Sequence, residues 1–390
     1  MAVINRIAEF QAEMTAWRRE IHAHPETAFE EHRTSAFVAK KLAEFGVEVH
    51  TGLAGTGVVG TLKGQGGTGR AIGLRADLDA LHIHEQNEIP HKSQNPGRMH
   101  ACGHDGHTTM LLGAAKYLAE TRNFQGTVHF IFQPAEENEG GGRVMVEQGL
   151  FKKFPVEAVF GLHNWPGMKL GSFAIRPGPQ MAAYDVFEIA VNGKGAHGAM
   201  PHQGIDPVVV ASQIVLGLQT IVSRNTHPLD AAVVSVTQIH GGDTWNVIPE
   251  QVTLRGTTRS FKPEVQDRIE ANIRRVAEGV CQAMGASMTM RYERRYPATI
   301  NATKEAEFAA RVAADVVGAD NVERDPTPSM GSEDFAFLLQ ACPGAYIWMG
   351  NGPDTGDRRL HSPHYDFNDE ALALGASYWA RMAELALPRG

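Results

Sequence analysis

The sequence predicts an α/β fold: a mostly parallel sheet flanked by helices, interrupted by a smaller inserted α+β domain of the ferredoxin-like type. Several strand candidates are apolar at every position and alternate with helical patterns, as in a sheet buried on both faces. Near Met181 the pattern changes to strands with alternating apolar and polar residues, in the order β-α-β-β-α-β. At 390 residues the chain exceeds the size of one hydrophobic core, so two domains are expected.

The N-terminal region begins with two helical patterns. Apolar side chains spaced three and four apart share one face of the first helix: Ile7, Phe10, Met14, Trp17 and Ile21. Pro25 cannot continue a helix and therefore closes it. A second helix is predicted from about Thr34 to Phe45, because Gly46 supplies a stop signal.

Strand and helix patterns then alternate as far as Asn164. The predicted strands read GVVGTLKG, AIGLRADL, GTVHFIFQ and VEAVFGLHN, and the predicted helices read HTTMLLGAAKYLAETR and GGRVMVEQGLF. Their continuous apolar runs are typical of parallel strands covered by helices on both faces. After Pro297 the pattern resumes with a helix, a strand reading AYIWMGNG and a terminal helix that ends near Leu387.

The region between these parts is predicted to be a separate module. Its strands read YDVFEIAVNG, AAVVSVTQIHGG, QVTLRGTTRSF and SMTMRYERRY, and its helices read DPVVVASQIVLGLQTIVSR and PEVQDRIEANIRRVAEGVCQAMG. This is the ferredoxin-like order, and roughly 110 residues is a usual size for one module. We therefore expect an inserted domain at 183–296 within a larger domain formed by 1–182 and 297–390.

Composition and charge exclude several classes of protein. Hydrophobic residues make up 43% of the chain and charged residues 21%, as in a globular protein without fibrous or disordered bias. A net charge of -8 argues against nucleic-acid and anionic-membrane partners, because both favour basic surfaces. Only three cysteines occur, no signal-peptide pattern opens the sequence, and no apolar run reaches the length of a bilayer span. The expectation is a cytoplasmic protein.

The stretch MHACGHDGHTTM, residues 99–110, concentrates one cysteine and three histidines. It could be a metal-binding segment, a nucleophilic cysteine with its base, or a loop that happens to be rich in these side chains. Cys102 and His104 lie two residues apart, and the glycines around them let the backbone bend. A nucleophilic cysteine needs a base and an orienting group, and predicts nothing about acids and histidines elsewhere. A metal site predicts further ligands at the carboxyl ends of other strands, where open α/β sheets place their sites.

Residues of that kind follow other predicted strands. GTVHFIFQ is followed by Glu136 and Glu137, whose adjacent carboxylates would repel each other without a cation or a shared proton. VEAVFGLHN carries His163 at its end, and His361 lies between the last strand and the last helix. Thiolate, imidazole and carboxylate ligands together suit zinc, manganese, nickel or cobalt. Each residue taken alone is more often structural, but their joint place at the strand ends of one sheet favours a metal centre.

These residues lie in motifs that extend over nearly the whole chain. The motifs read RREIHAHPETAFEEHRTS, LRADLDAL, MHACGHDGHTTMLLGAA, QPAEENEGGG, GLHNWP, GKGAHGAMPHQGIDP, NVIPE, MGSEDFAF and HSPHYDFNDEAL. In their order and spacing the chain resembles the dinuclear-metal metallopeptidase family of aminoacylases and glutamate carboxypeptidases. The resemblance is specifically to its amidohydrolase branch of hippurate hydrolases, N-acyl-amino-acid deacylases and indole-acetyl-amino-acid hydrolases. It implies a catalytic α/β domain with an inserted lid or dimerisation domain.

The resemblance also implies a set of ligands for two divalent metal ions of undetermined identity. The ligands are Cys102, His104, Glu137, His163 and His361, with the cysteine between the two ions. Glu136, directly before one of these ligands, corresponds to the catalytic acid/base of the family. Neighbouring strand residues can serve both purposes because their side chains diverge.

Further positions that the resemblance assigns lie in the inserted module. His197 corresponds to a histidine that reaches the scissile carbonyl, often from the partner subunit of a dimer. Asn246 and Arg259 correspond to a pair that holds the substrate carboxylate, which a guanidinium matches bidentately. Without the resemblance, Arg259 would be interpreted as a solvated strand residue.

Three further features concern the surroundings of the site. Asp77 and Asp79 could accept a hydrogen bond from a ligand imidazole, and we expect Asp77 to do so. His82 stands where relatives carry proline, which departs from the family pattern, and it is not expected to be a ligand. His22, His24 and His107 are expected to cap or pack helices.

The implied reaction is hydrolysis of the amide bond of an N-acyl amino acid by a metal-activated water, with Glu136 as general acid/base. The implied partner is a second copy of the chain, in a homodimer or homotetramer formed through the inserted domain. Two alternatives remain: a dipeptidase or carboxypeptidase on the same metal core, and a non-catalytic metal-dependent binding protein. A zinc nucleobase deaminase is excluded, because the H-x-E and P-C-x-x-C pattern is absent from the sequence.

Overall fold

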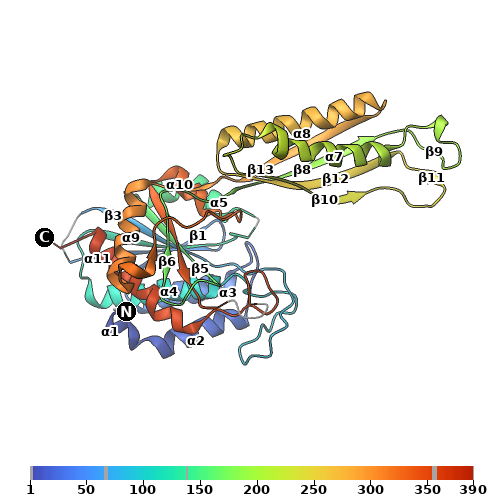
Figure 1. Ribbon diagram of the computed structural model, residues 1–390. Helices are drawn as coiled ribbons and strands as arrows, with labels where there is room; N and C mark the ends of the chain where they lie inside the picture. Colours follow the sequence, from blue (N-terminus) through green and yellow to red (C-terminus); the bar gives the residue numbers. More distant parts are fainter. Residues whose placement is uncertain (1–2, 66–68, 138, 354–357, 390) are drawn as a thin grey trace. The chain divides into compact units, whose positions relative to one another are not determined.

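The chain divides into two compact units, each described here by itself. The computed structural model describes residues 3–65, 69–137, 139–353 and 358–389 (Figure 1). Unit 1 comprises Met1–Gln180, Thr299–Thr327 and Asp334–Gly390, and unit 2 comprises Met181–Ala298 and Pro328–Glu333.

The boundaries of unit 2 lie two residues outside the expected limits of 183 and 296. The segment 328–333 belongs to unit 2, although the sequence analysis placed it in the larger domain. The reason is local pairing: the backbone N–H of Ala182 donates to the carbonyl oxygens of Ser329 and Gly331.

In the described part of unit 1, strands form an eight-stranded sheet with the order β1-β2-β4-β3-β5-β16-β6-β15. The strands are β1 (Glu48–Leu53), β2 (Gly57–Lys63), β3 (Ala71–Asp77), β4 (Thr127–Gln133), β5 (Ala158–Trp165), β6 (Phe173–Ala174), β15 (Val322–Glu323) and β16 (Gly344–Gly350). A separate two-stranded sheet joins β7 (Gly178–Met181) to β14 (Thr299–Asn301).

The expected parallel arrangement occupies the centre of this sheet. β3 runs parallel to β4 and β5, and β16 runs parallel to β5. The edge differs, because β2 is antiparallel both to β4 and to β1. The sequence analysis missed β1, whose residues are mostly exposed, so that it has no continuous apolar run.

Helices cover both faces of the sheet of unit 1 (Figure 1). They are α1 (Asn5–Ala8), α2 (Gln11–Ala23), α3 (His32–Glu44), α4 (His104–Thr121), α5 (Gly141–Glu147), α6 (Leu150–Lys153), α9 (Thr303–Val317), α10 (Phe335–Ala341) and α11 (Leu372–Ala386). The first predicted helix consists of two separate helices in the structure, α1 and α2. The five apolar side chains predicted to share one face are all buried. The helix predicted for GGRVMVEQGLF is likewise divided into two helices, α5 and α6, because Gly149 lies between them with φ 87°.

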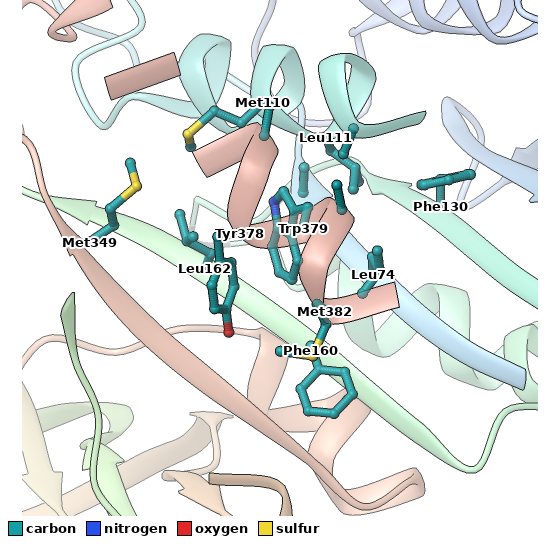
Figure 2. Packing of buried hydrophobic residues seen from close by; sticks show 14 of the residues in the cluster. Leu74, Met110, Leu111, Phe130, Phe160, Leu162, Met349, Tyr378, Trp379 and Met382 are labelled. Atoms are coloured by element: carbon teal, nitrogen blue, oxygen red, sulfur yellow. The ribbon is translucent and has the colours of Figure 1, made fainter. Parts of the chain in front are cut away.

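The main core of unit 1 lies between the sheet, α4 and α11. Figure 2 shows this packing, with side chains from the strands (Leu74, Phe130, Phe160, Leu162, Met349), from α4 (Met110, Leu111) and from α11 (Tyr378, Trp379, Met382). Gly375 allows the two helices to approach closely, because a Cβ atom there would lie 2.0 Å from the sulfur of Met110. This packing fixes α4, whose first residue is the predicted ligand His104.

Unit 2 has the predicted ferredoxin-like arrangement. Its elements are β8 (Ala183–Asn192), β9 (Ala196–His197), α7 (Pro207–Asn225), β10 (Ala232–His240), β11 (Val247–Ile248), β12 (Gln251–Ser260), α8 (Pro263–Ala283) and β13 (Ser287–Tyr296). The described strands form an antiparallel sheet with the order β10-β12-β8-β13, and α7 and α8 pack together on it. A short ribbon of β9 and β11 lies at one end of this sheet (Figure 1).

One sequence expectation about apolar runs needs correction. By length and composition alone, α7 is apolar enough to cross a membrane. In the structure, one face of α7 is buried in the core of unit 2 through Val210, Ile214, Leu218 and Ile221. The structure therefore accounts for this face of the helix as part of the core of a globular unit.

Candidate metal centre

The predicted ligands of unit 1 come from four places along the chain. Cys102 lies in the loop before α4, and His104 is the first residue of that helix. Glu137 follows β4, and His163 is the third residue from the end of β5. His361 lies in the loop after β16, with its backbone in the left-handed region at φ 64°. The ends of β4, β5 and β16 share one sheet edge, where sites of open α/β sheets form.

The structure brings all five predicted ligands into one cluster. The sulfur of Cys102 lies 3.3 Å from Nε2 of His163, and Nε2 of His361 lies 3.2 Å from Oε1 of Glu137. Three overlapping groups each have their ligand atoms within 4.8 Å of one another: Cys102, His104 and His163; Cys102, Glu137 and His361; His104, Glu136 and Glu137. Each of these groups could hold a metal ion, and the sulfur of Cys102 belongs to two of them.

The hydrogen bonds of two imidazole rings orient them toward the cluster. Nδ1 of His163 lies 2.6 Å from the carbonyl oxygen of Asn164, and Nδ1 of His104 lies 2.9 Å from the carbonyl oxygen of Asp79. A carbonyl oxygen only accepts, so Nδ1 carries the proton in both rings. Nε2 is then the nitrogen of each ring that could bind a metal ion, and Nε2 of His104 is buried without a hydrogen-bond partner among the described residues.

The aspartate that contacts the ligand imidazole is Asp79, which corrects the expectation for Asp77. Oδ1 of Asp79 lies 3.2 Å from Nδ1 of His104, and its Oδ2 accepts a hydrogen bond of 2.8 Å from the backbone of Glu137. Asp77 instead accepts from Arg75 and His107, and it lies 3.8 Å from the nearest nitrogen of His104. Asp77 ends β3, whereas Asp79 lies two residues beyond the strand, where its backbone carbonyl and its carboxylate both contact Nδ1 of His104.

The electrostatics of the cluster favour a bound cation. Burial, and the charges of Glu137 and other carboxylates, raise the pKa of the Cys102 thiol well above its usual range. Burial alone would lower the pKa of His104, but the carboxylates of Asp77 and Asp79 raise it to about 10. Buried negative groups need positive charge nearby. A divalent ion would supply that charge and allow the cysteine to bind as thiolate.

The adjacent residues Glu136 and Glu137 lie in a turn after β4, so the alternation of side chains along a strand does not explain why they point in different directions. β4 ends at Gln133, and Ala135 has a left-handed backbone with φ 54°. The backbone N–H of Ala135 donates to the carboxylate of the buried Glu31 at 2.9 Å. Glu136 is 6% exposed, and its Oε1 accepts from the backbone of Asp334. The sequence analysis missed Glu31, although the residue lies within one of the quoted motifs.

A buried scaffold beneath the ligands was also missed. It includes Asn164, Tyr365 and His107, all of them in quoted motifs and all at most 1% exposed. The only signal in the sequence was their position beside predicted ligands, which does not show what each side chain touches. His107 was expected to cap or pack α4; it packs against the rings of His104 and His163, and its Nδ1 lies 2.7 Å from the carboxylate of Asp77.

Unit 2 carries the remaining predicted site residues in two separate places. His197 and Val247 pair in the ribbon of β9 and β11, and the carbonyl of Asn246 accepts from the backbone of Gly198. Arg259 lies near the other end of β12, eight residues beyond Gln251. Eight strand steps span roughly 26 Å. Within one chain, the structure therefore brings His197 and Asn246 together but keeps Arg259 apart from both.

The guanidinium of Arg259 is held in a defined position. It lies over the ring of Tyr184 at 4.3 Å and donates to the carbonyl oxygens of Met330 and Thr258. It also donates to the hydroxyl of Thr257. Burial lowers the pKa of Arg259. A carboxylate ligand would offset that loss of solvation, which suits the predicted role.

Comparisons with known proteins agree with the geometry. The profile of peptidase family M20/M25/M40 matches residues 73–385. Hippurate hydrolase of Campylobacter jejuni is 42% identical over 98% of this chain and 99% of its own length. N-acetylcysteine deacetylase of Bacillus subtilis is 39% identical over 97% and 98%. The crystal structure of a dinuclear metal-binding peptidase of the M20 family from Bacillus subtilis superposes with a TM-score of 0.84, at 37% identity, covering 97% of this chain and 99% of that one.

Proposed function

The chain belongs to peptidase family M20/M25/M40, and on that premise we propose that it hydrolyses the amide bond of N-acyl amino acids to a carboxylic acid and a free amino acid. Relatives that match nearly its full length are a hippurate hydrolase and an N-acetylcysteine deacetylase. The observation that carries the proposal is the cluster of five metal-ligating side chains next to the carboxylate of Glu136. A site that only bound metal would not need that additional carboxylate.

The protein is a metal-dependent enzyme, and we assign its two divalent ions to five ligands. The ligands are Cys102, His104, Glu137, His163 and His361, with Cys102 shared, because its sulfur belongs to two of the ligand groups. The bound ions would lower the pKa of a water molecule and polarise the acyl carbonyl. Thiolate and imidazole ligands suit zinc, manganese, nickel or cobalt, and metal replacement would identify the native ion.

Glu136 is proposed as the general acid/base. Its carboxylate lies within 4.8 Å of ligand atoms of His104 and Glu137, in reach of a water held there. It would take a proton from the attacking water and deliver it to the leaving amine. The contact with the backbone N–H of Asp334 holds one of its oxygens and orients the other.

Arg259 is proposed to anchor the free carboxylate of the substrate, with His197 stabilising the oxyanion and Asn246 assisting. One chain cannot present all three to one small substrate, because roughly 26 Å of β12 separates the ribbon from Arg259. A second copy of the chain would complete the site by supplying His197 and Asn246. We therefore propose a homodimer in which these two residues act across the interface.

The surface of unit 2 supports a contact between copies. β10 is an edge strand of the sheet, and its Ile239 is 59% exposed. The neighbouring helix α7 exposes Leu216 and two adjacent valines, and Arg224 is its only charged residue. Edge strands and uncharged apolar faces are usually covered in the functional state. A second copy pairing along β10 would cover both.

We also propose a cytoplasmic location. All three cysteines are unpaired and buried, as expected of a protein in a reducing compartment. Fractionation of cells that produce the tagged protein would test this.

Metal removal tests the proposed function directly. The purified protein would be depleted with a chelator and assayed on hippurate, N-acetyl amino acids and dipeptides, before and after addition of each candidate metal. We expect activity on N-acyl amino acids to disappear and to return with one of the metals. Faster cleavage of dipeptides would favour the peptidase alternative, and metal binding without turnover would favour a binding protein. Undiminished activity after exhaustive chelation would refute the proposal.

A further inference from the structure

A set of buried hydrogen bonds lies beneath the ligand cluster, which we call the bracket: Asn164, Tyr365 and His107. None of the three is a predicted ligand, and no step of the proposed reaction uses them. Each is at most 1% exposed. The bracket connects the three segments of unit 1 that deliver Cys102, His163 and His361.

Asn164 forms the centre of the bracket. Its side-chain amide donates a hydrogen bond of 2.7 Å to the carbonyl oxygen of Cys102 and lies 3.0 Å from Nε2 of His107. The backbone carbonyl oxygen of Asn164 accepts a hydrogen bond of 2.6 Å from Nδ1 of His163. One residue therefore holds the backbone of one predicted ligand and the ring of another.

Tyr365 ties the loop that carries His361 to this centre. Its hydroxyl donates to Oδ1 of Asn164 at 2.9 Å, and the side-chain amide of Asn351 lies 3.4 Å from the same hydroxyl. The backbone of His361 itself donates to the carbonyl oxygen of Ala101 at 2.8 Å. One end of the short segment 361–365 is thus bonded to Ala101, next to Cys102, and the other end to Asn164, whose side chain bonds the carbonyl of Cys102.

The residue between the ligands Cys102 and His104 leaves room for the bracket only because it is a glycine, Gly103. Gly103 has φ 91°, in the left-handed region. A Cβ atom at that position would lie 2.3 Å from the side-chain nitrogen of Asn164 and 2.5 Å from the hydroxyl of Tyr365. Asn164 and Tyr365 therefore pack directly against Gly103, which joins Cys102 to His104.

His107 closes the bracket on the side of the sheet. Nε2 of His107 accepts the backbone N–H of Asn164 at 2.9 Å, so its proton is on Nδ1, which donates to Asp77 at 2.7 Å. Its ring lies 4.6 Å from the ring of His163 and is stacked on the ring of His104 at 5.5 Å. The rings of His104 and His163 thus both pack against His107, whose two ring nitrogens are each held by a hydrogen bond.

From this geometry we infer that Asn164 and Tyr365, with His107, are positioning residues that set where the sulfur of Cys102 stands relative to His163 and His361. The inference rests on the proposed function. A shared thiolate must meet two ions at short, fixed distances, so a small shift of the 101–104 loop weakens both metal sites together. The bracket also keeps the thiol of Cys102 fixed before any metal binds.

The smallest test removes one hydroxyl. Tyr365→Phe keeps the ring but cuts the link to Asn164. Tyr378→Phe is the matched control, because Tyr378 is also fully buried and its hydroxyl has no hydrogen-bond partner among the described residues. Asn164→Ala removes the same link from the other side, together with the contacts of the side-chain amide to Cys102 and His107, and it retains the test if Tyr365→Phe fails to fold. The double variant combines both substitutions.

Two measurements on each full-length variant report the position of the thiol. Cobalt titration, followed by the charge-transfer absorption of the cobalt thiolate, gives metal affinity. We expect it to weaken 10–100-fold in Tyr365→Phe, with no larger effect in the double variant than in Asn164→Ala, because one link is cut. Iodoacetamide labelling of the chelated protein, mapped by mass spectrometry, should be severalfold faster at Cys102, with the buried Cys281 and Cys342 as internal references.

Cobalt affinity and Cys102 labelling in Tyr365→Phe equal to those in Tyr378→Phe would overturn the bracket. That result would leave the proposed function intact. If the parent protein neither bound two cobalt ions nor hydrolysed N-acyl amino acids, the proposed function would fail instead. Labelling of the chelated variants would still decide the bracket, since it needs neither metal nor turnover.

Discussion

At the scale of single residues, chemistry depends on the direction in which each side chain is held. Glu136 and Glu137 are adjacent and identical in type, yet one faces His361 and the other accepts from the backbone of Asp334. Ala135, directly before them, has a left-handed backbone, so the chain leaves the strand conformation before it reaches either glutamate. Strained backbone of this kind persists where neighbouring contacts hold it, here the bond from Ala135 to Glu31.

The different surroundings of the two glutamates predict different effects of substitution. Glu136→Gln should keep both metals, because Glu136 is not assigned as a ligand, but should reduce turnover at least about a hundredfold, or ~3 kcal/mol of transition-state stabilisation. Glu137→Gln should instead lose metal. Metal content and kcat on an N-acetyl amino acid, measured for both variants, check this. A Glu136→Gln enzyme with parental turnover would show that the acid/base is another group.

The fixed guanidinium of Arg259 predicts an effect that depends on the substrate. Arg259→Ala should raise KM for substrates with a free carboxylate by roughly 10–100-fold, because a charge-assisted bidentate contact is lost. Amides of the same substrates, which lack that charge, should be affected little. Comparison of kcat/KM for each pair of substrates measures the difference. Equal losses on both members of a pair would contradict the anchoring role.

At the scale of elements, the start of α4 is held by ion pairs from α2. Arg18 and His22 lie one turn apart on the buried face of α2, and both face the carboxylate of Asp105 in the first turn of α4. His22 also contacts Glu85, and Arg18 contacts Asp366 at 2.8 Å. The same contacts that fix two helices thus fix the residue after the ligand His104.

This network predicts a dependence of stability on pH. Burial alone would lower the pKa of His22, but hydrogen bonds to Asp105 and Glu85 raise it to about 9. The raised value means that protonated His22 stabilises the fold fully below about pH 6.5, and that this contribution, about 3 kcal/mol, is lost as pH rises through about 9. The free energy of unfolding of the parent and of His22→Asn, from urea titrations, should therefore converge toward about pH 10. A difference that stays constant with pH would contradict the assignment.

At the scale of the whole molecule, the two units carry different residues of the predicted site. Unit 1 holds the five predicted metal ligands, and unit 2 holds Arg259 at one end of β12 and His197 with Asn246 at the other. Because the ends of one strand cannot meet, the catalytic assembly proposed here depends on a second chain. Activity and oligomeric state should therefore change together.

The uncharged face of α7 gives a test of that dependence. Leu216→Glu, at a position 64% exposed, should convert the dimer to a monomer and lower kcat at least tenfold, because a charge is disfavoured at an apolar interface. The metal content should not change, since all proposed ligands lie in unit 1. Leu385→Glu, on the exposed side of α11 in unit 1, is the matched control. Light scattering and activity measurements check both, and a fully active monomer would contradict the shared site.

The sequence by itself predicted most of the order of the elements and the side chains that the structure brings together at the carboxyl ends of the strands. Continuous apolar runs indicate buried strands, and ligand-type residues that follow several such strands predict a metal centre at one sheet edge. The choice of Cys102, His104, Glu137, His163 and His361 as its ligands came from the family resemblance of the motifs around them. The ferredoxin-like module followed from its alternating strands. These features depend on the pattern of apolar and polar residues within each segment, which can be read directly from the sequence.

Only the tertiary structure decided which neighbours each of these residues has. It placed Asp79 rather than Asp77 against His104, added β1 to the edge of the sheet, and separated Asn246 from Arg259 by the length of β12. It also joined Asn164 to Tyr365, two hundred and one positions apart in the chain. Contacts between distant residues depend on how helices and strands pack together, and that packing is not written in the local pattern of any one segment.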